Sequence, residues 1–245
     1  MYNVGDVRAR ALGRSGRSRV WRVILAAATA SFAALCSGTA ATEGSVCPPG
    51  MVFAVSGVCI DQYEWPNRAG KNPLLGASGV PEPQDVAAGR VMDAEHLCAS
   101  VGKRVCTARE WTAACRGPEG APYPWGSKVP RYTPGRGGGV CNYDKLYRAA
   151  DEYLVHKRDP VEMRYLDQSE PAGSRPECRS ASGAYDMMGN AEEWVRCSWG
   201  RDGWCLAGRF WAEPRACTAM VPNHSPRWHY VTTSFRCCFD TGRKR

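Results

Sequence analysis

Several patterns that identify common functional classes are missing from this sequence. Although the chain of 245 residues contains 13 cysteines, no two of them form a Cys-x-x-Cys pair. This absence argues against a zinc knuckle and against a thioredoxin-type redox pair. No glycine-rich loop lies between a predicted strand and a predicted helix, so the run GRGGGV at 135–140 is interpreted as a flexible loop and not as a phosphate site. No Ser-His-Asp or Cys-His combination has a supporting motif around it.

Long hydrophobic runs are also absent, with one exception near the N-terminus. Six arginines between residues 8 and 22 precede an apolar run at 23–35, and small residues follow at 39–41. This order is typical of a secretory signal, and the run is short for a membrane span. We therefore predict a signal peptide over 1–41, cleaved near Ala41, and an exported domain over 42–245, periplasmic or secreted, with no membrane span. The alternatives are an uncleaved N-terminal anchor and, disfavoured by the bulky Leu35, a lipid anchor on Cys36.

The positive charge of the chain is concentrated in this leader. Removing 1–41 takes away six arginines and Asp6, a net +5, and leaves about +3 of the formal +8. The remaining charge gives no support to nucleic-acid binding.

Cysteine is abundant in what remains. An even number of cysteines in an exported chain predicts up to six disulfides, although the sequence does not reveal their connectivity. These twelve cysteines are Cys47, Cys59, Cys98, Cys106, Cys115, Cys141, Cys178, Cys197, Cys205, Cys217, Cys237 and Cys238. The length suits one disulfide-stabilised domain.

Local patterns predict short elements of both kinds. Two β-rich runs over 51–65, broken at Ser56-Gly57, favour a hairpin. Asp93 is expected to cap a helix over 94–101, and the Thr107/Glu110 capping box is expected to start a second helix that ends at Gly117. The segment 148–167 is predicted to hold one short helix, and the rest is read as short strands and loops. The fold class is therefore α+β and rich in loops.

Four sequence blocks occur in an order that resembles a known family. They are CIDQYEWPN, GKRVCTAREWTAACRG with YPWG, EPAGSRPECRSASGAYDMMGNAEEW, and SFRCC. The corresponding family patterns are I-D-x-Y-E-V-T-N, G-K-R-L-P-T-E-A-E-W-E-x-A-A-R-G with Y-P-W-G, G-L-Y-D-M-x-G-N-V-W-E-W, and G-F-R-C. The chain thus resembles the formylglycine-generating-enzyme-like family, also called the sulfatase-modifying-factor domain. This resemblance implies a single-domain variant of the C-type lectin fold.

The resemblance also implies structural calcium at the turn 183–194. Ca²⁺ prefers six to eight hard oxygen ligands, which a sharp Gly-Asn turn can supply from its carbonyls. Carried over, Glu193 supplies the carboxylate, and Gly189 and Ala191 supply carbonyls with help from Met188 or Asn190. A second family site would use Asn142 and Tyr143. The alternative is that Gly189-Asn190 is only a turn and that Glu193 forms a salt bridge or caps a helix. The neighbouring Tyr185, Met187, Met188 and Trp194 are expected to be core residues.

Family members that oxidise a peptide cysteine to formylglycine hold copper(I) with two thiolates after a G-G-S-[FW] motif. Here Gly208-Arg209-Phe210-Trp211 replaces that motif, and Ala212 and Glu213 stand where the first thiolate is expected. Cys217 matches the second thiolate or a structural cysteine. A copper site would then need Cys205 or the Cys237-Cys238 pair near Cys217, because one sulfur does not make the two-coordinate site.

A non-haem iron site is a further possibility, because another branch of the family uses iron. It would draw on His224 and His229, with Asp240 as a distant third ligand. The alternative is that the four histidines of the chain, which include His96 and His156, are ordinary loop residues.

The function predicted from these observations is an exported, divergent family member without the copper pair. It would be a calcium-stabilised module that binds a peptide, protein or glycan, with Trp211 and Arg215 in the cleft. The alternatives are an oxidoreductase of the copper or non-haem iron type that modifies an exported protein, and a scaffold within an envelope assembly. Tryptophans in predicted loops are candidate anchors for the partner, namely Trp65, Trp125, Trp199, Trp204, Trp211 and Trp228.

Overall fold

The computed structural model describes residues 47–136 and 139–242. The predicted signal peptide, 1–41, lies outside these residues. Among the described residues no helix has the length and apolar character needed to span a membrane.

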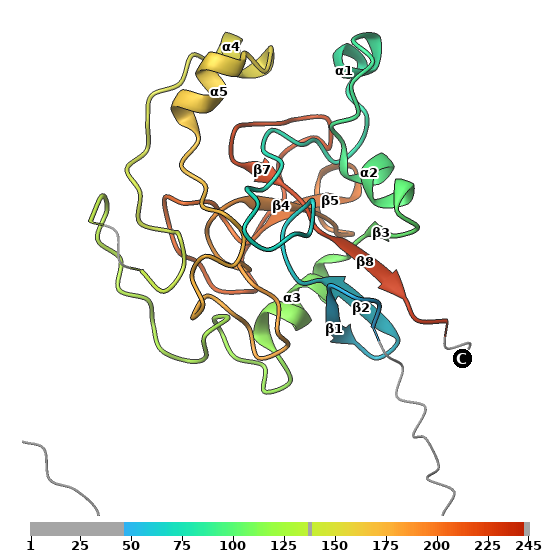
Figure 1. Ribbon diagram of the computed structural model, residues 1–245, viewed down its shortest axis with the longest axis vertical. Helices are drawn as coiled ribbons and strands as arrows, with labels where there is room; N and C mark the ends of the chain where they lie inside the picture. The colour runs from blue at the N-terminus through green and yellow to red at the C-terminus, as the bar shows by residue number, and fades with distance from the viewer. Residues whose placement is uncertain (1–46, 137–138, 243–245) are drawn as a thin grey trace, which may run out of the picture. The chain divides into compact units, whose positions relative to one another are not determined.

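Two small sheets form the framework of the domain (Figure 1). The first is antiparallel and has the order β1 (Met51–Val55), β2 (Val58–Asp61), β8 (Cys237–Asp240), β3 (Arg104–Val105). The second has the order β6 (Met220–Val221), β5 (Trp204–Ala207), β4 (Glu192–Arg196), β7 (Thr233–Ser234), in which only the β4–β7 pair is parallel. The predicted hairpin is confirmed, since β1 and β2 pair across Gly57, whose φ of 80° suits glycine.

The two marked helices form where their caps predict. The side chain of Asp93 accepts a hydrogen bond from the His96 amide at the start of α2 (Ala94–Ser100). Thr107 and Glu110 form the complete capping box of α3 (Ala108–Arg116), and Gly117 follows with a φ of 65°. The buried face of α3 carries Trp111 and packs against both sheets.

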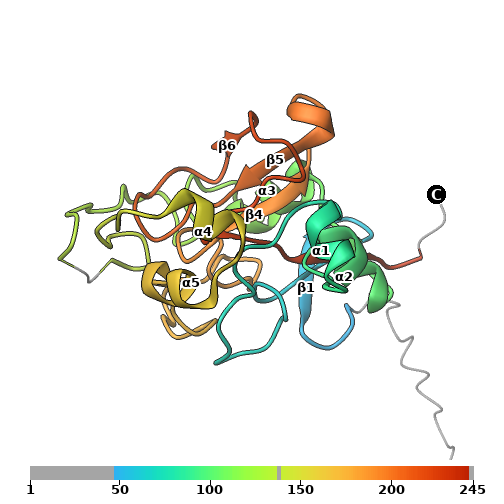
Figure 2. The same ribbon diagram turned by 90° about the horizontal axis from the view of Figure 1, so that it is seen from above.

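The segment 148–167 differs from expectation, because it holds two short helices instead of one. These are α4 (Glu152–His156) and α5 (Pro160–Leu166), which lie together in Figure 2. Asp151 caps the first, and Asp159 caps the second with Pro160 at its first position. Proline suits that position because the helix start needs no amide donor there. A further short helix, α1 (Pro83–Ala87), lies within a predicted loop.

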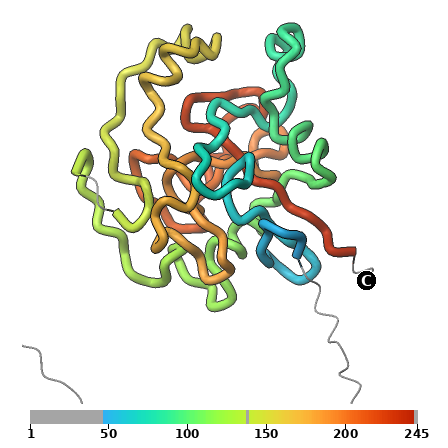
Figure 3. The backbone as a smooth tube through the Cα atoms, in the orientation of Figure 1, coloured from blue at the N-terminus to red at the C-terminus, as the bar shows by residue number. Residues whose placement is uncertain are grey.

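Long irregular segments connect these elements, above all over 117–136, 139–151 and 167–191, as the tube of Figure 3 shows. Six disulfides link all twelve cysteines of the described chain: Cys47–Cys59, Cys98–Cys237, Cys106–Cys238, Cys115–Cys217, Cys141–Cys178 and Cys197–Cys205. The loop-rich, disulfide-stabilised α+β fold is therefore confirmed.

Candidate functional site

A row of alternating charges lies where the sequence departs from the family motifs. Glu192 begins β4, and Arg209 follows the end of β5 with a φ of 59°, directly after Gly208 with a φ of 83°. Arg209 Nη1 is 3.8 Å from Glu192 Oε2, and its Nη2 is 3.1 Å from Glu213 Oε2. The same Glu213 oxygen is 3.2 Å from Arg215 Nη2. We call Glu192, Arg209, Glu213 and Arg215 the charged row.

The two carboxylates of the charged row have different environments. Glu192 is 5% exposed, and its Oε1 accepts a hydrogen bond from Thr232 Oγ1 at 3.2 Å. Burial raises the pKa of Glu192, and the charge of Arg209 only partly opposes this. For Glu213, partial burial disfavours ionisation, but the hydrogen bonds and charges of Arg215 and Arg209 outweigh it and lower the pKa. The two arginines therefore stabilise the ionised form of Glu213.

Three of the four members of the charged row replace family residues that differ from them in chemistry. In the block GNAEEW, Glu192 stands where the family pattern has tryptophan, and Arg209 stands where G-G-S-W has its second glycine. Glu213 stands in the stretch where the first copper thiolate is expected. Since Arg209 lies beside both Glu192 and Glu213 in the structure, the departures from the motifs are concentrated in one place.

Trp211 and Arg215, predicted together as cleft residues, have different roles. Trp211 is only 2% exposed and packs in a cluster with Leu166 and Val231, so the expectation that it presents its ring to a ligand is corrected. Arg215 has 48% of its side chain exposed and is available at the surface. Trp204 is likewise a buried strand residue and not a loop residue, whereas Trp199 is 63% exposed.

Cys217, the predicted catalytic cysteine, is bonded to Cys115 of α3. The other cysteines considered as its copper partner are also paired, Cys205 with Cys197, Cys237 with Cys98, and Cys238 with Cys106. A disulfide sulfur is not a thiolate ligand, so this arrangement supplies no thiolate pair for copper(I).

The histidines predicted as possible iron ligands are separated from their proposed third ligand. His224 stacks on Trp228, and His229 stacks on His156. Asp240 instead pairs with Arg104. Within the described residues, no group of three or more His, Cys, Asp or Glu side chains is arranged as a metal site.

The residues of the two predicted calcium sites come together at the turn 183–194. The Asn190 amide donates to the Asn142 carbonyl oxygen at 2.8 Å, and Asn142 Nδ2 donates to Asn190 Oδ1 at 3.1 Å. Gly189 has a φ of 76°, and a Cβ there would lie 2.1 Å from the Asn142 oxygen. Tyr143 is buried beside this contact, and Ala191 donates its amide to Glu64 Oε1. The turn therefore requires glycine for both conformation and space.

Glu193 does not fit the role of calcium ligand in this arrangement. Its Oε1 lies 2.6 Å from Arg236 Nη2, and its Oε2 accepts from Arg236 Nε and Trp111 Nε1, both at 2.7 Å. The alternative interpretation, that Glu193 forms a salt bridge, describes this geometry.

Two further buried carboxylates near Arg236 were not singled out by the sequence analysis. Burial and repulsion from Asp186 and Glu193 raise the pKa of Glu64 well above its usual value. Burial, with repulsion from Glu193, likewise raises the pKa of Asp186 to about 6. Among the described residues Arg236 forms its carboxylate hydrogen bonds with Glu193, so Glu64 and Asp186 lack a cation in direct contact. A bound hard cation would favour their ionised forms. Asp186 is the Asp of the motif YDMMGN, so its place beside the glycine turn was a signal in the sequence for this cluster.

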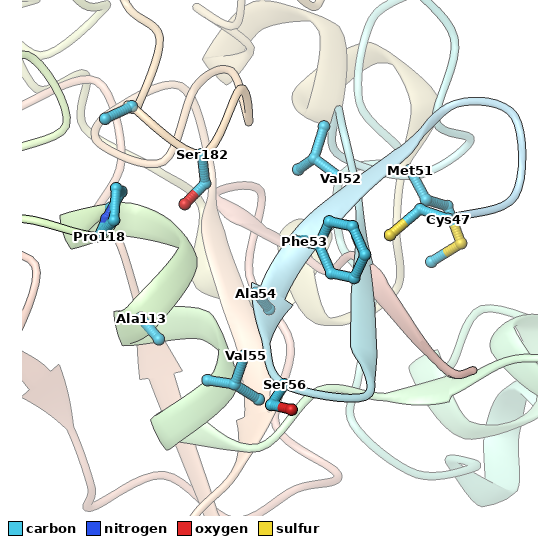
Figure 4. A pocket seen from close by; sticks show the side chains of 12 residues that line it. Cys47, Met51, Val52, Phe53, Ala54, Val55, Ser56, Ala113, Pro118 and Ser182 are labelled. Carbon is cyan, nitrogen blue, oxygen red and sulfur yellow. The ribbon is translucent and has the colours of Figure 1, made fainter. Parts of the chain in front are cut away.

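An open apolar hollow of about 1010 Å³ lies beside the edge strand β1. Figure 4 shows Phe53 of β1 with Ala113, Pro118 and Ser182 around it. None of its lining residues belongs to the charged row.

Comparisons with known proteins agree with the motifs. A family model described as the sulfatase-modifying factor enzyme 1-like domain matches residues 62–234. Over 193 residues the chain is 28% identical to a Mus musculus protein named inactive C-alpha-formylglycine-generating enzyme 2. That match covers 74% of this chain and 58% of the relative, so the chain spans little more than half of the relative's length.

Three solved structures are also similar at low identity. PvdO from Pseudomonas aeruginosa is 19% identical with a TM-score of 0.46, over 75% of this chain and 80% of that one. CarF is 15% identical with a TM-score of 0.43, and the match covers 75% of this chain and 86% of CarF. Treponema denticola variable protein 1 is 17% identical with a TM-score of 0.35, and the match covers 55% of this chain and 46% of that protein. The family match, which covers more than half of the chain, decides the assignment. The chain belongs to the sulfatase-modifying factor enzyme 1-like domain family and has its variant of the C-type lectin fold.

Proposed function

We propose that this domain is an exported binding module of the family, and that it does not perform copper-dependent oxidation of cysteine. The observation that carries the proposal is the Cys115–Cys217 disulfide, which occupies the sulfur expected as the second copper ligand. Glu213, which stands where the first thiolate is expected, is engaged with two arginines. The mouse relative, which carries the word inactive in its name, is consistent with this reading.

The binding partner is a peptide or protein, with a glycan as the alternative. The charged row offers a partner a half-exposed arginine, Arg215, and a half-exposed carboxylate, Glu213. Charged groups at the rim of an interface confer specificity and speed association more than they add affinity.

Export is supported by the cysteine chemistry. Six disulfides persist in an oxidising compartment and are rare where thiols are kept reduced. The signal peptide over 1–41 stays a prediction from the sequence.

Calcium stabilisation of the turn is the last part of the proposal. Asp186 and Glu64, rather than Glu193, would supply the carboxylate oxygens, because the charge of Arg236 already neutralises Glu193. The donors to Glu64 are neutral amides, Asn190 Nδ2 and the Ala191 backbone amide, and the donor to Asp186 is the Gly173 amide. Backbone carbonyls of the Gly189 turn would complete an oxygen-rich set suited to Ca²⁺.

Thiol counting tests the central claim. The mature chain is purified from an oxidising compartment, denatured, and alkylated with and without reductant before intact mass spectrometry. We expect no adduct without reductant and twelve with it. In a parallel assay, a cysteine-containing peptide is incubated with the protein, copper(I) and oxygen, and we expect no aldehyde product. Alkylation of Cys217 without reductant, together with aldehyde formation, would overturn the proposal in favour of the copper-dependent oxidoreductase.

A further inference from the structure

We propose that Arg209 and Arg215 form a binding site for a carboxylate of the partner, and that Glu213 occupies this site as an internal substitute. The ligand is an acidic side chain of a peptide, which displaces Glu213. This inference rests on the proposed binding function and specifies the chemistry of the partner.

The contacts of Glu213 resemble those of a bound carboxylate. Its Oε2 lies 3.1 Å from Arg209 Nη2 and 3.2 Å from Arg215 Nη2, so one oxygen bridges two guanidinium groups. Guanidinium groups bind carboxylates through charge-assisted hydrogen bonds, and their planar forks match the planar carboxylate. A peptide carboxylate can therefore replace both contacts with contacts of the same kind.

Arg209 is held in place as a preorganised half of the site. Its side chain is 20% exposed, and its guanidinium lies over the Phe210 ring at 5.2 Å. Glu192 Oε2 is 3.8 Å from Nη1, which is too long for a hydrogen bond, so Glu192 leaves this donor free. The buried Arg209 Nε has no hydrogen-bond partner among the described residues. Arg209 Nη1 is thus the donor that a second carboxylate oxygen can use, whereas the buried Nε is out of its reach.

Arg215 and Glu213 form the movable half of the site. Both lie in the irregular segment between β5 and β6, with 48% and 43% of their side chains exposed. The Arg215 amide contacts the buried Met188 sulfur at 3.1 Å, which holds its backbone while the side chain reaches solvent. Exposed ion pairs contribute about 0.2 to 1 kcal/mol each, so displacement of Glu213 from its two contacts costs on the order of 1 kcal/mol.

The test compares two peptides and four forms of the mature chain. The probes are acetylated, amidated Gly-Gly-Glu-Gly-Gly and the same peptide with glutamine at its centre, titrated by NMR at low salt. The chains are the unaltered sequence, Glu213→Gln, Arg215→Gln, and Glu119→Gln, the last as a control at an exposed glutamate outside the charged row.

We expect the glutamate peptide to bind Glu213→Gln about fivefold more tightly than the unaltered chain, which corresponds to about 1 kcal/mol, the cost of displacing Glu213. Glu119→Gln should bind the glutamate peptide with the affinity of the unaltered chain, and Arg215→Gln should lose most of this binding. The glutamine peptide should not bind any form. Equal affinity of the unaltered and Glu213→Gln chains, or equal binding of both peptides, would overturn the inference.

The double variant Arg209→Gln/Glu213→Gln separates the contribution of Arg209, and we expect it to lose the gain seen in Glu213→Gln. A circular-dichroism melt verifies its folding, and Arg215→Gln, altered only at a half-exposed side chain, keeps the test decisive if Arg209 proves structurally essential. Failure of peptide binding with fully oxidised cysteines would reject this site alone, whereas copper-dependent oxidation would reject the proposed function.

Discussion

Arg236 and Glu193 form a fully buried ion pair, in which Nη2 lies 2.6 Å from Oε1 and Nε lies 2.7 Å from Oε2. Arg236 also donates to the Tyr185 carbonyl oxygen at 2.9 Å, so one guanidinium joins the end of the chain to the strand β4 and to the glycine turn. Buried charges of this kind persist only when they are paired, because removing them from water is costly.

Removal of Arg236 should therefore be strongly destabilising. For Arg236→Gln we expect a loss of about 3 to 5 kcal/mol in the free energy of unfolding, because Glu193 is left buried without its counter-charge. Urea denaturation measures the loss. The matched control is Arg201→Gln, at an exposed side chain, which should stay within about 0.5 kcal/mol of the unaltered chain. A loss below about 1 kcal/mol for Arg236→Gln would contradict this account.

Two glycines with similar backbone angles should respond differently to alanine. Gly57 has a φ of 80° with open space at its Cβ position, whereas Gly189 has a φ of 76° and the Asn142 carbonyl oxygen 2.1 Å away. Gly57→Ala should cost about 1 to 2 kcal/mol for the left-handed conformation alone. Gly189→Ala should cost about 1 to 3 kcal/mol more, because the turn must move apart from Asn142. Thermal and urea unfolding of both variants compare the two costs, and equal losses would show that the close contact is unimportant.

The disulfides should contribute more to stability when they close a longer stretch of chain, with a logarithmic dependence on its length. Cys115 and Cys217 are 102 residues apart, and Cys197 and Cys205 are 8 apart. Restriction of the unfolded chain predicts about 4.7 kcal/mol for the first bond and about 2.5 kcal/mol for the second. The double alanine variants of each pair, unfolded in guanidinium chloride, test the order. A larger loss from the Cys197/Cys205 variant would reject the chain-entropy explanation.

Acid should destabilise the domain through His229. Burial, with the nearby charge of Arg158, lowers the pKa of His229 to about 4, whereas in the unfolded chain it is about 6.5. Between these values the unfolded state binds the proton and the folded state does not. Stability is therefore retained above pH 6.5 and lost as the pH falls toward 4, by about 3 kcal/mol in total.

The unfolding free energy, measured from pH 4 to pH 7, should change with pH with a slope that the variant His229→Asn largely removes. His96→Asn, altered at an exposed ring, is the control and should keep the slope. A slope that is unchanged in His229→Asn would assign the acid sensitivity to another group.

Calcium should raise the melting temperature if Asp186 and Glu64 hold the ion. At a concentration one hundred times the dissociation constant, the stabilisation is about 2.7 kcal/mol, or roughly 5 to 10 °C for a domain of this size. Asp186→Asn should abolish the shift, because it removes the charge while keeping an oxygen for the Gly173 amide. Asp202→Asn, at an exposed aspartate that also has a left-handed φ, is the control. Fluorimetric melts with Ca²⁺ and with chelator measure both variants, and a shift retained in Asp186→Asn would exclude this ligand set.

Local sequence signals determined much of the architecture. The capping box at Thr107 and Glu110, the cap at Asp93 and the break at Gly57 all act within a few residues, so they could be read without the fold. The even number of cysteines predicted up to six disulfides from composition alone. The second helix of 148–167 had a readable signal in Asp159-Pro160 that was not used.

Only the tertiary structure decided which distant residues meet. Arg236 reaches Glu193 across 43 positions, and Cys217 joins Cys115 across 102. The sequence also determined that Arg209 and Glu213 replace family residues, but their bridge to Arg215 became evident only in the folded chain. The physical reason is that local patterns govern backbone angles over a few residues, whereas ion pairs, disulfides and burial depend on how strands and loops pack in space.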